Sequence, residues 1–280
     1  MSKSLKVTLA TLLFVAPAAA MQDSSSGDRT SSAPATFSQP EEKKLSDSVF
    51  SGGRTKRALA AQIMLDRADY SPGVIDGRGG GNTSHAIEAY QRANGLTVDG
   101  EASTELLRHL RDGNGGDFIR VVQLRRKDTS DSYEDIPEDW ADQAEMDRLG
   151  YESLDELIAE RYHMDIDLLG AMNPNVDWAN AKAGTPILVV RAGPSKLKQT
   201  VDRIVVDKGT SSVSAYAGDK LLARYPATIG SSSLPSPSGT MEVRAVAPDA
   251  NYTFNPETNN WGGDEALTLP PGPNLSLIHI

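Results

Sequence analysis

Apolar residues in the segment 54–112 recur three and four positions apart, which is the spacing of one helix face. This period predicts three short helices, the first over residues 57–68. Asn82 or Thr83 can cap the second helix, and Ser103 can cap the third. The side chains expected to face inward on the last two helices are Ala86, Tyr90, Ala93, Leu106, Leu107 and Leu110. The segment is therefore predicted to be a small all-α bundle.

Two Asp-Gly dipeptides, Asp76-Gly77 and Asp99-Gly100, punctuate this bundle. Each is a turn signal, because Asp hydrogen-bonds its own backbone and Gly adopts a positive φ without strain. The runs P-G-V-I-D-G, ending at Gly77, and Y-Q-R-A-N-G-L-T-V-D-G, ending at Gly100, resemble the signature of the three-helix peptidoglycan-binding module of cell-wall enzymes. The resemblance spans residues 70–110 and implies that the partner is peptidoglycan.

In that family the glycan strand or stem peptide lies in a shallow groove beside the Asp-Gly loops. The resemblance therefore implies five candidate peptidoglycan-binding residues, which are Asp76, Asn82, Thr83, Gln91 and Asp99. Asp76, Thr83 and Asp99 are equally suited to structural roles in turns and caps. The alternative for the module as a whole is a compact helical spacer.

Residues 148–192 show the helical period again in a shorter unit. Ser153 and Glu156 form a capping box before the first helix, and Asp165 can cap a second one. Residues 185–190, T-P-I-L-V-V, then read as a strand. This order resembles a LysM repeat, a βααβ unit, and implies a second site for glycan that contains N-acetylglucosamine. The first strand of such a unit is not evident in the sequence, and an ordinary helical hairpin fits the same residues.

Beyond Gly193 the helical period gives way to β-branched and alternating runs, which predict a mostly-β domain. The predicted strands are Arg203–Asp207, Ser212–Tyr216, Lys220–Ile229 and Thr240–Val246. The sequence from Val201 to Asn274 contains the runs I-V-V-D, S-V-S-A-Y and P-S-P-S-G-T-M-E-V. It resembles the opening half of the L,D-transpeptidase catalytic domain, also called the YkuD domain. That resemblance implies cross-linking or remodelling of peptidoglycan by acyl transfer.

The nucleophile of that family is missing from this sequence. The family uses a cysteine thiolate, which attacks a stem-peptide carbonyl and is a good leaving group when an amine then attacks the thioester. The 280 residues of this sequence contain no cysteine. We therefore expect no catalytic residue here, and an incomplete copy of the domain with an atypical tail at residues 275–280. His279 follows an Ile, as the catalytic His of the family does, but Ile280 stands where the family has Gly. The gene is expected to continue after Asn274 into a Ser-His-Gly-Cys-x-Arg motif.

Composition narrows the possible partners. The net charge is −10, and nine Asp or Glu but no Lys or Arg lie between Asp128 and Asp147. This balance argues against nucleic acid, whose phosphates require a surplus of cations. The acidic run predicts a solvated linker over residues 113–147. The histidines have no metal-ligand spacing, so neither a metal nor another cofactor is expected.

The N-terminus predicts export. Residues 1–20 combine Lys3 and Lys6, a short apolar run and three alanines, which is typical of a signal peptide. Residues 21–53 are rich in Ser, Thr, Pro and Gly, and are expected to form a disordered tether. We expect the protein in the periplasm or cell wall, with no membrane anchor after cleavage of the signal peptide.

These patterns predict a multi-domain α+β chain. Its parts are a small all-α three-helix module, a small helical LysM-like module and an incomplete mostly-β L,D-transpeptidase-like domain. The expected function is cross-linking or remodelling of peptidoglycan by an exported L,D-transpeptidase family protein, inactive in this copy. One alternative is a non-catalytic peptidoglycan-binding protein. Another is a cell-wall hydrolase, which would need a set of zinc ligands that these histidines do not supply.

Overall fold

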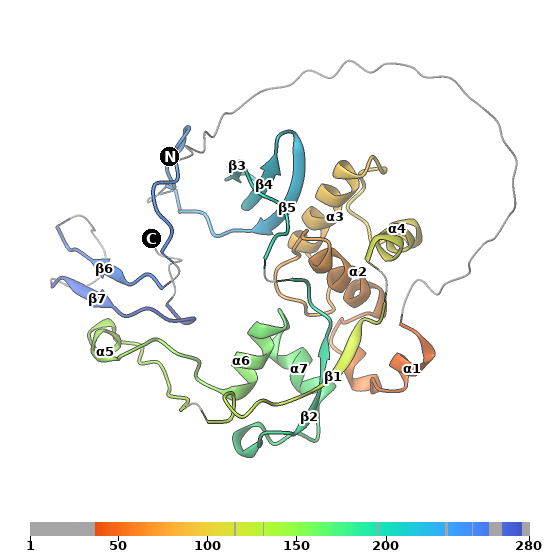
Figure 1. The fold of residues 1–280 in the computed structure, drawn as a ribbon, viewed down its shortest axis with the longest axis horizontal. Helices are drawn as coiled ribbons and strands as arrows, with labels where there is room; N and C mark the ends of the chain where they lie inside the picture. Colours follow the sequence, from red (N-terminus) through yellow and green to blue (C-terminus); the bar gives the residue numbers. More distant parts are fainter. Residues whose placement is uncertain are drawn as a thin grey trace, which may run out of the picture.

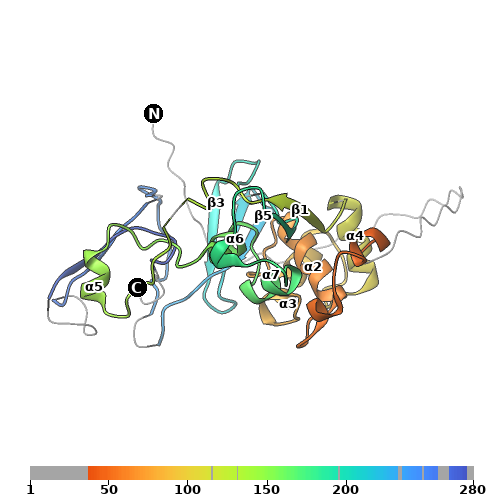
Figure 2. The same cartoon turned by 90° about the horizontal axis from the view of Figure 1, so that it is seen from below.

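The computed structural model describes residues 37–114, 116–130, 132–194, 196–232, 235–247, 249–257 and 265–275. The predicted signal peptide, residues 21–36 of the predicted tether, and residues 276–280 with His279 lie outside this part of the chain. Figure 1 shows the arrangement of the elements, and Figure 2 shows the same fold from below.

The predicted three-helix module is present. Its helices are α2 (Lys56–Arg67), α3 (Gly81–Ala93) and α4 (Thr104–Asn114). Thr55 caps α2 by accepting a hydrogen bond from the Ala58 amide at 3.0 Å, and Ser103 accepts one from the Leu106 amide at 3.1 Å, as its predicted capping role requires. Helix packing buries Leu106, Leu107 and Leu110 in the core.

Two details of α3 differ from the prediction. Gly80 is the N-cap, not Asn82 or Thr83, and Thr83 lies inside the helix with its side chain turned toward α2. Ala86 and Tyr90 are buried as expected, but Ala93 is exposed. Ala93 is the last residue of the helix, and the chain turns away after it through Gly95, whose φ is 67°.

The prediction of a disordered tether is wrong for residues 37–53. This segment forms the helix α1 (Gln39–Glu42) and the 3-10 helix η1 (Asp47–Phe50), and its buried side chains are Phe37, Leu45 and Val49. The rings of Phe37 and Phe118 lie 4.9 Å apart, and the Glu41 carboxylate accepts hydrogen bonds from the Phe118 and Ile119 amides at 2.5 and 3.2 Å. A few well-placed apolar residues fold this segment, because the neighbouring core supplies the surface on which they are buried.

A βααβ unit follows the helical module. Its elements are β1 (Ile119–Gln123), α6 (Leu154–Arg161), α7 (Ile166–Met172) and β2 (Pro186–Val190), with α5 (Trp140–Glu145) between β1 and α6, and the 3-10 helix η2 (Trp178–Asn180) before β2. The strands pair antiparallel, with Ile119 opposite Val190. β1 is the strand that the sequence did not reveal. It lies within the predicted linker 113–147, because a strand of five residues with an Arg and a Gln carries little signal until its distant partner is known.

The prediction that the acidic run is a solvated linker is also wrong at its first residue. Asp128 is buried, and its carboxylate accepts hydrogen bonds from the guanidinium groups of Arg125 and Arg161 at 2.8 to 3.1 Å. Although burial opposes it, these hydrogen bonds hold the pKa of Asp128 well below its ordinary value. Asp128 therefore ties the loop after β1 to α6.

The helical module and the βααβ unit share one hydrophobic core, which runs from Phe37 to Val190. Their backbones also meet, since the Ile75 amide donates to the His163 carbonyl at 2.8 Å and the Asp165 amide donates to the Ile75 carbonyl at 3.0 Å. We call residues 37–194 the folded body.

The C-terminal region is less consolidated. It contains a three-stranded antiparallel sheet of β3 (Arg203–Asp207), β4 (Ser212–Ala217) and β5 (Lys220–Pro226), and a separate pair of β6 (Tyr252–Phe254) and β7 (Leu267–Leu269). β5 lies beside α3, and the β6–β7 pair lies beside α5 (Figure 1). In both views this pair and the α2–α4 bundle occupy opposite ends of the molecule (Figure 2).

Two strand predictions need correction. β5 ends at Pro226, not Ile229, and the Ala227 amide makes one further hydrogen bond to the Ser211 carbonyl at 2.8 Å. Thr240–Val246 is not a strand, and Met241, Val243 and Val246 are exposed. Its alternating pattern fits a strand, but within the described residues nothing pairs with it.

Candidate functional site

The two Asp-Gly loops of the helical module are held by the same arrangement of atoms. Gln62 of α2 accepts hydrogen bonds at Oε1 from the amides of Asp76 and Gly77, at 3.2 and 2.7 Å, and donates from Nε2 to Asp76 Oδ1 at 2.8 Å. Gln91 of α3 accepts from the amides of Asp99 and Gly100, at 3.0 and 3.1 Å, and donates to Asp99 Oδ1 at 2.6 Å. We call these contacts the glutamine clamps.

Each clamp satisfies polar groups that would otherwise be costly to bury. Gln62 and Gln91 are 2% and 3% exposed. Each Asp also accepts a hydrogen bond from the amide two residues later, Arg78 at 2.8 Å and Glu101 at 2.9 Å. An unsatisfied buried group costs about 1–3 kcal/mol, so the clamps fix both loops firmly.

Four of the five predicted binding residues belong to the clamps. Thr83 is buried and accepts a hydrogen bond at 3.2 Å from Gln62, which also donates to Asp76. In the second clamp, Gln91 donates to Asp99. The hydrogen bond from Gln91, followed by that from the Glu101 amide, lowers the pKa of Asp99. These contacts favour the structural roles that the sequence left open for Asp76, Thr83 and Asp99, and extend them to Gln91.

The fifth residue, Asn82, is exposed on the first turn of α3. Two valines on the loops, Val74 and Val98, are also exposed, by 59% and 45%. Asn82, Val74 and Val98 therefore offer the accessible surface near the clamped loops. Gln62 is not among the residues predicted from the sequence, although a polar residue within the apolar stretch of α2 is a usable signal.

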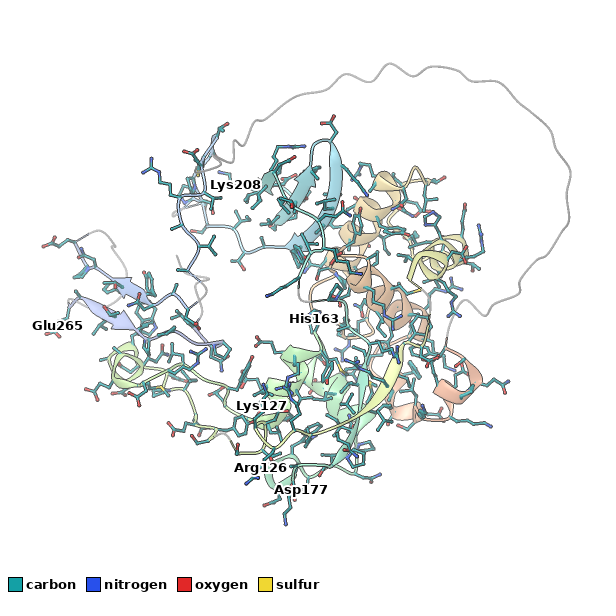
Figure 3. All side chains as sticks on the ribbon, viewed as in Figure 1. Arg126, Lys127, His163, Asp177, Lys208 and Glu265 are labelled. Carbon is teal, nitrogen blue, oxygen red and sulfur yellow. The ribbon has the colours of Figure 1, made fainter. Side chains whose placement is uncertain are left out.

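A second polar cluster joins the helical module to the βααβ unit. Asp66 of α2 lies 3.0 Å from Nδ1 of His163, and accepts a hydrogen bond from the Gly193 amide at 2.6 Å. The hydrogen bond to Asp66 raises the pKa of His163. Arg54 and Asp165 form a further ion pair at 3.5 Å across the same boundary. Figure 3 shows His163 between the two units.

Gly193 is required in this cluster by close packing. A Cβ atom at this position would overlap the backbone carbonyl of Asp66. The cluster therefore fixes the end of the folded body against the last turn of α2.

Two open cavities lie elsewhere. One, of about 700 Å³, is lined by residues of the acidic segment and of the C-terminal region, including Tyr133, Arg148 and Pro271. The other, of about 480 Å³, lies at the C-terminal end of α2, where Arg67 is part of its lining. Within the part of the chain that the structure describes, no three His, Asp or Glu side chains gather as metal ligands.

Comparison with known families supports the interpretation of the helical module. Residues 54–110 match the family described as "Putative peptidoglycan binding domain". A search of curated proteins finds no match. The module thus supports peptidoglycan as a partner and association with the cell wall. In addition, no helix among the described residues is long and apolar enough to cross a membrane.

Proposed function

We propose that this protein is exported and binds peptidoglycan through the folded body. The observation that carries the proposal is the family match over residues 54–110, on a module whose two Asp-Gly loops are both held in place by glutamine clamps. Rigid loops favour binding, because little conformational freedom is lost when a ligand docks against them.

The exposed residues near these loops are proposed as the contact surface. Val74, Val98 and Asn82 are free to touch a ligand, whereas Gln62 and Gln91 act by holding the loops. A wall glycan presents apolar sugar faces as well as hydroxyl groups, so a surface of two valines and one amide is chemically suitable.

The test is co-sedimentation of the full chain with purified sacculi. We expect the triple variant Val74→Ser, Val98→Ser, Asn82→Ala to be retained less than the wild type. The matched control is Val206→Ser with Val243→Ser, because these valines are 55% and 49% exposed but lie on β3 and in the segment 240–246, outside the folded body. Equal retention of the wild type and an unrelated protein of similar charge would favour the spacer alternative.

The βααβ unit is proposed as a LysM-like second site for wall glycan. The order strand, helix, helix, strand and the antiparallel pairing of β1 with β2 support this proposal. Soluble oligomers of N-acetylglucosamine should shift the amide resonances of the βααβ unit more than those of β3–β5. Shifts confined to the C-terminal region would contradict it.

We also propose that residues 201–274 are related to the opening part of an L,D-transpeptidase domain. The antiparallel β3–β4–β5 sheet supports this proposal, and the absence of the Thr240–Val246 strand weighs against it. The reaction of that family needs a thiolate, and the 280 residues contain no cysteine. We therefore expect no release of D-alanine from a stem tetrapeptide by this chain, and protein-dependent release would refute that expectation.

A further inference from the structure

The cavity of about 480 Å³ collects positive charge in an otherwise acidic chain. Its charged lining is Arg67, Asp69, Arg120, Arg191 and Lys198, and Leu222 of β5 closes one side. The lining residues come from the helical module, the βααβ unit, the segment after β2 and the C-terminal sheet. We call this cavity the junction pocket.

Arg67 is fixed in the wall of the pocket by two backbone acceptors. Its Nε donates to the Arg191 carbonyl at 2.8 Å, and its Nη2 donates to the Asp117 carbonyl. Burial, followed by the neighbouring Arg191, lowers the pKa of Arg67, as expected where cations crowd together. An anion in the pocket would relieve this repulsion.

The other three cations of the pocket, Arg120, Arg191 and Lys198, do not form an ion pair with any carboxylate among the described residues. Arg120 lies over the ring of Tyr162, with its guanidinium carbon 5.4 Å from the ring centroid. Guanidinium groups bind carboxylates in a forked geometry, so an unpaired pair of arginines is a suitable carboxylate site.

Asp69 gives the pocket a second, opposite charge. Its backbone is held in the left-handed region, with φ of 66°, by the Arg224 amide, which donates to the Asp69 carbonyl at 2.9 Å. Its carboxylate forms no ion pair within the described part of the chain. Burial, followed by Asp66, raises the pKa of Asp69, and the nearby charge of Lys198 opposes this rise only in part, so a bound ammonium group would offset the remainder.

We propose that the junction pocket binds the zwitterionic end of an amino acid in a peptide, with its carboxylate between Arg120 and Arg191 and its ammonium group at Asp69. This inference rests on the proposed function, because the stem peptides of peptidoglycan that contain a diamino acid carry such an end. The pocket is then a peptide site at the C-terminal end of α2, separate from the Asp-Gly loops.

The experiment measures binding of a soluble stem tetrapeptide with a free diamino-acid end to the full chain by titration calorimetry. Arg120→Gln with Arg191→Gln should weaken binding by about tenfold, since both charge-assisted contacts are lost. The matched control is Arg126→Gln with Lys127→Gln, which removes two exposed cations from the loop after β1 (Figure 3) and should leave the affinity unchanged.

The ligand provides a second test, and its first comparison uses the wild-type chain alone. Amidation of the carboxylate at the diamino-acid end should weaken binding to the wild type by about the same factor, and should have little further effect on the double variant. Asp69→Asn should weaken binding of the peptide but not of its analogue without the ammonium group. Asn also adopts the left-handed conformation, so the backbone should be preserved.

The outcomes separate this inference from the proposed function. If sacculi retain the chain but the tetrapeptide does not bind, or binds equally to the two double variants, the junction pocket proposal is overturned and wall binding stands. If inorganic phosphate at equal ionic strength displaces the peptide fully, the pocket is a general anion site and the zwitterion proposal fails. Binding of neither sacculi nor peptide overturns both proposals.

Discussion

The folded body and the C-terminal strands bury their apolar residues in different ways. In the folded body, side chains far apart in sequence, such as Phe37, Phe118 and Val190, meet in one core. In the C-terminal region, buried apolar residues occur in small groups, such as Ala215, Leu222 and Ala223 in the sheet, and Phe254 and Leu269 in the hairpin. An isolated two-stranded hairpin such as β6–β7 is at best marginally stable in water.

The difference shows that the boundaries of family modules need not be the boundaries of folding units. The family match ends at residue 110, yet the core continues to Val190 and includes Phe37, which precedes the match. A fragment cut at residues 54–112 would therefore expose the faces of α2 and α4 that pack against these neighbours. We expect residues 37–194 to be the smallest fragment that folds with native stability.

The largest expected effect separates the two regions directly. Phe118→Ala should lower the free energy of unfolding of the folded body by about 3–5 kcal/mol, because this buried ring packs against Phe37, just before α1, and against Arg111 of α4. Phe254→Ala is the matched variant, since Phe254 is also buried but lies on β6 of the C-terminal hairpin, where its ring packs near Trp140 of α5. Urea unfolding followed by circular dichroism should show little change in the main transition for Phe254→Ala. Equal losses of unfolding free energy in the two variants would show that the two regions unfold as one unit.

The buried carboxylate of Asp128 is expected to stabilise the interior of the folded body. Asp128→Asn should cost about 1–3 kcal/mol, because Arg125 and Arg161 lose their charged acceptor. The pKa of Asp128 is lowered in the folded state, so its contribution is present above the ordinary Asp value of about 3.8 and is lost as the pH falls below it. The gap between wild type and variant should narrow in acid. A gap that stays constant from neutral to acidic pH would contradict this assignment.

The glutamine clamps test whether the loops are held locally. Gln91→Ala should cost about 1–3 kcal/mol, since the amides of Asp99 and Gly100 lose their acceptor. Faster hydrogen exchange should be concentrated in the loop at Asp99. Gln62→Ala should act in the same way at Asp76, and an effect spread evenly over both loops from either variant would argue against separate clamps.

The smallest expected effect concerns the boundary between the two units of the body. Because the pKa of His163 is raised by Asp66, the protonated pair stabilises the fold below about pH 6.5, and this contribution is lost as the pH rises through the folded-state value. The effect should stay under about 1 kcal/mol, since the histidine is partly exposed. His163→Asn should remove this pH dependence from unfolding curves, and should suit the positive φ of 56° at this position. An unchanged pH dependence of stability in the variant would show that His163 is not its cause.

The local parts of the fold were predictable from the sequence, and the long-range parts were not. The spacing of Leu106, Leu107 and Leu110, and the Asp-Gly turns, report on contacts within a few residues. β1 and the tether segment are different, because Ile119 and Phe37 become buried only through partners that lie far along the chain. Thr240–Val246 shows the converse case, in which a correct strand period has no partner within the described residues.

The candidate site followed the same rule. The sequence marked Asp76, Gln91 and Asp99 as important, but it could not show that their polar atoms bond to each other and to Gln62. The junction pocket was not foreseen, because its cations come from Arg67, Arg120 and Arg191, which no local pattern connects.

The central claim is that the helical module and the βααβ unit form one cooperative body, and native-state hydrogen exchange of the full chain tests it most directly. The amides of α2, α3, β1 and β2 should share one opening free energy, higher than that of β3–β5. Phe118→Ala should lower that shared value in all four elements together. If β1 and β2 instead opened at a lower free energy than α2 and α3, and Phe118→Ala changed only one of the two pairs, the claim would be contradicted.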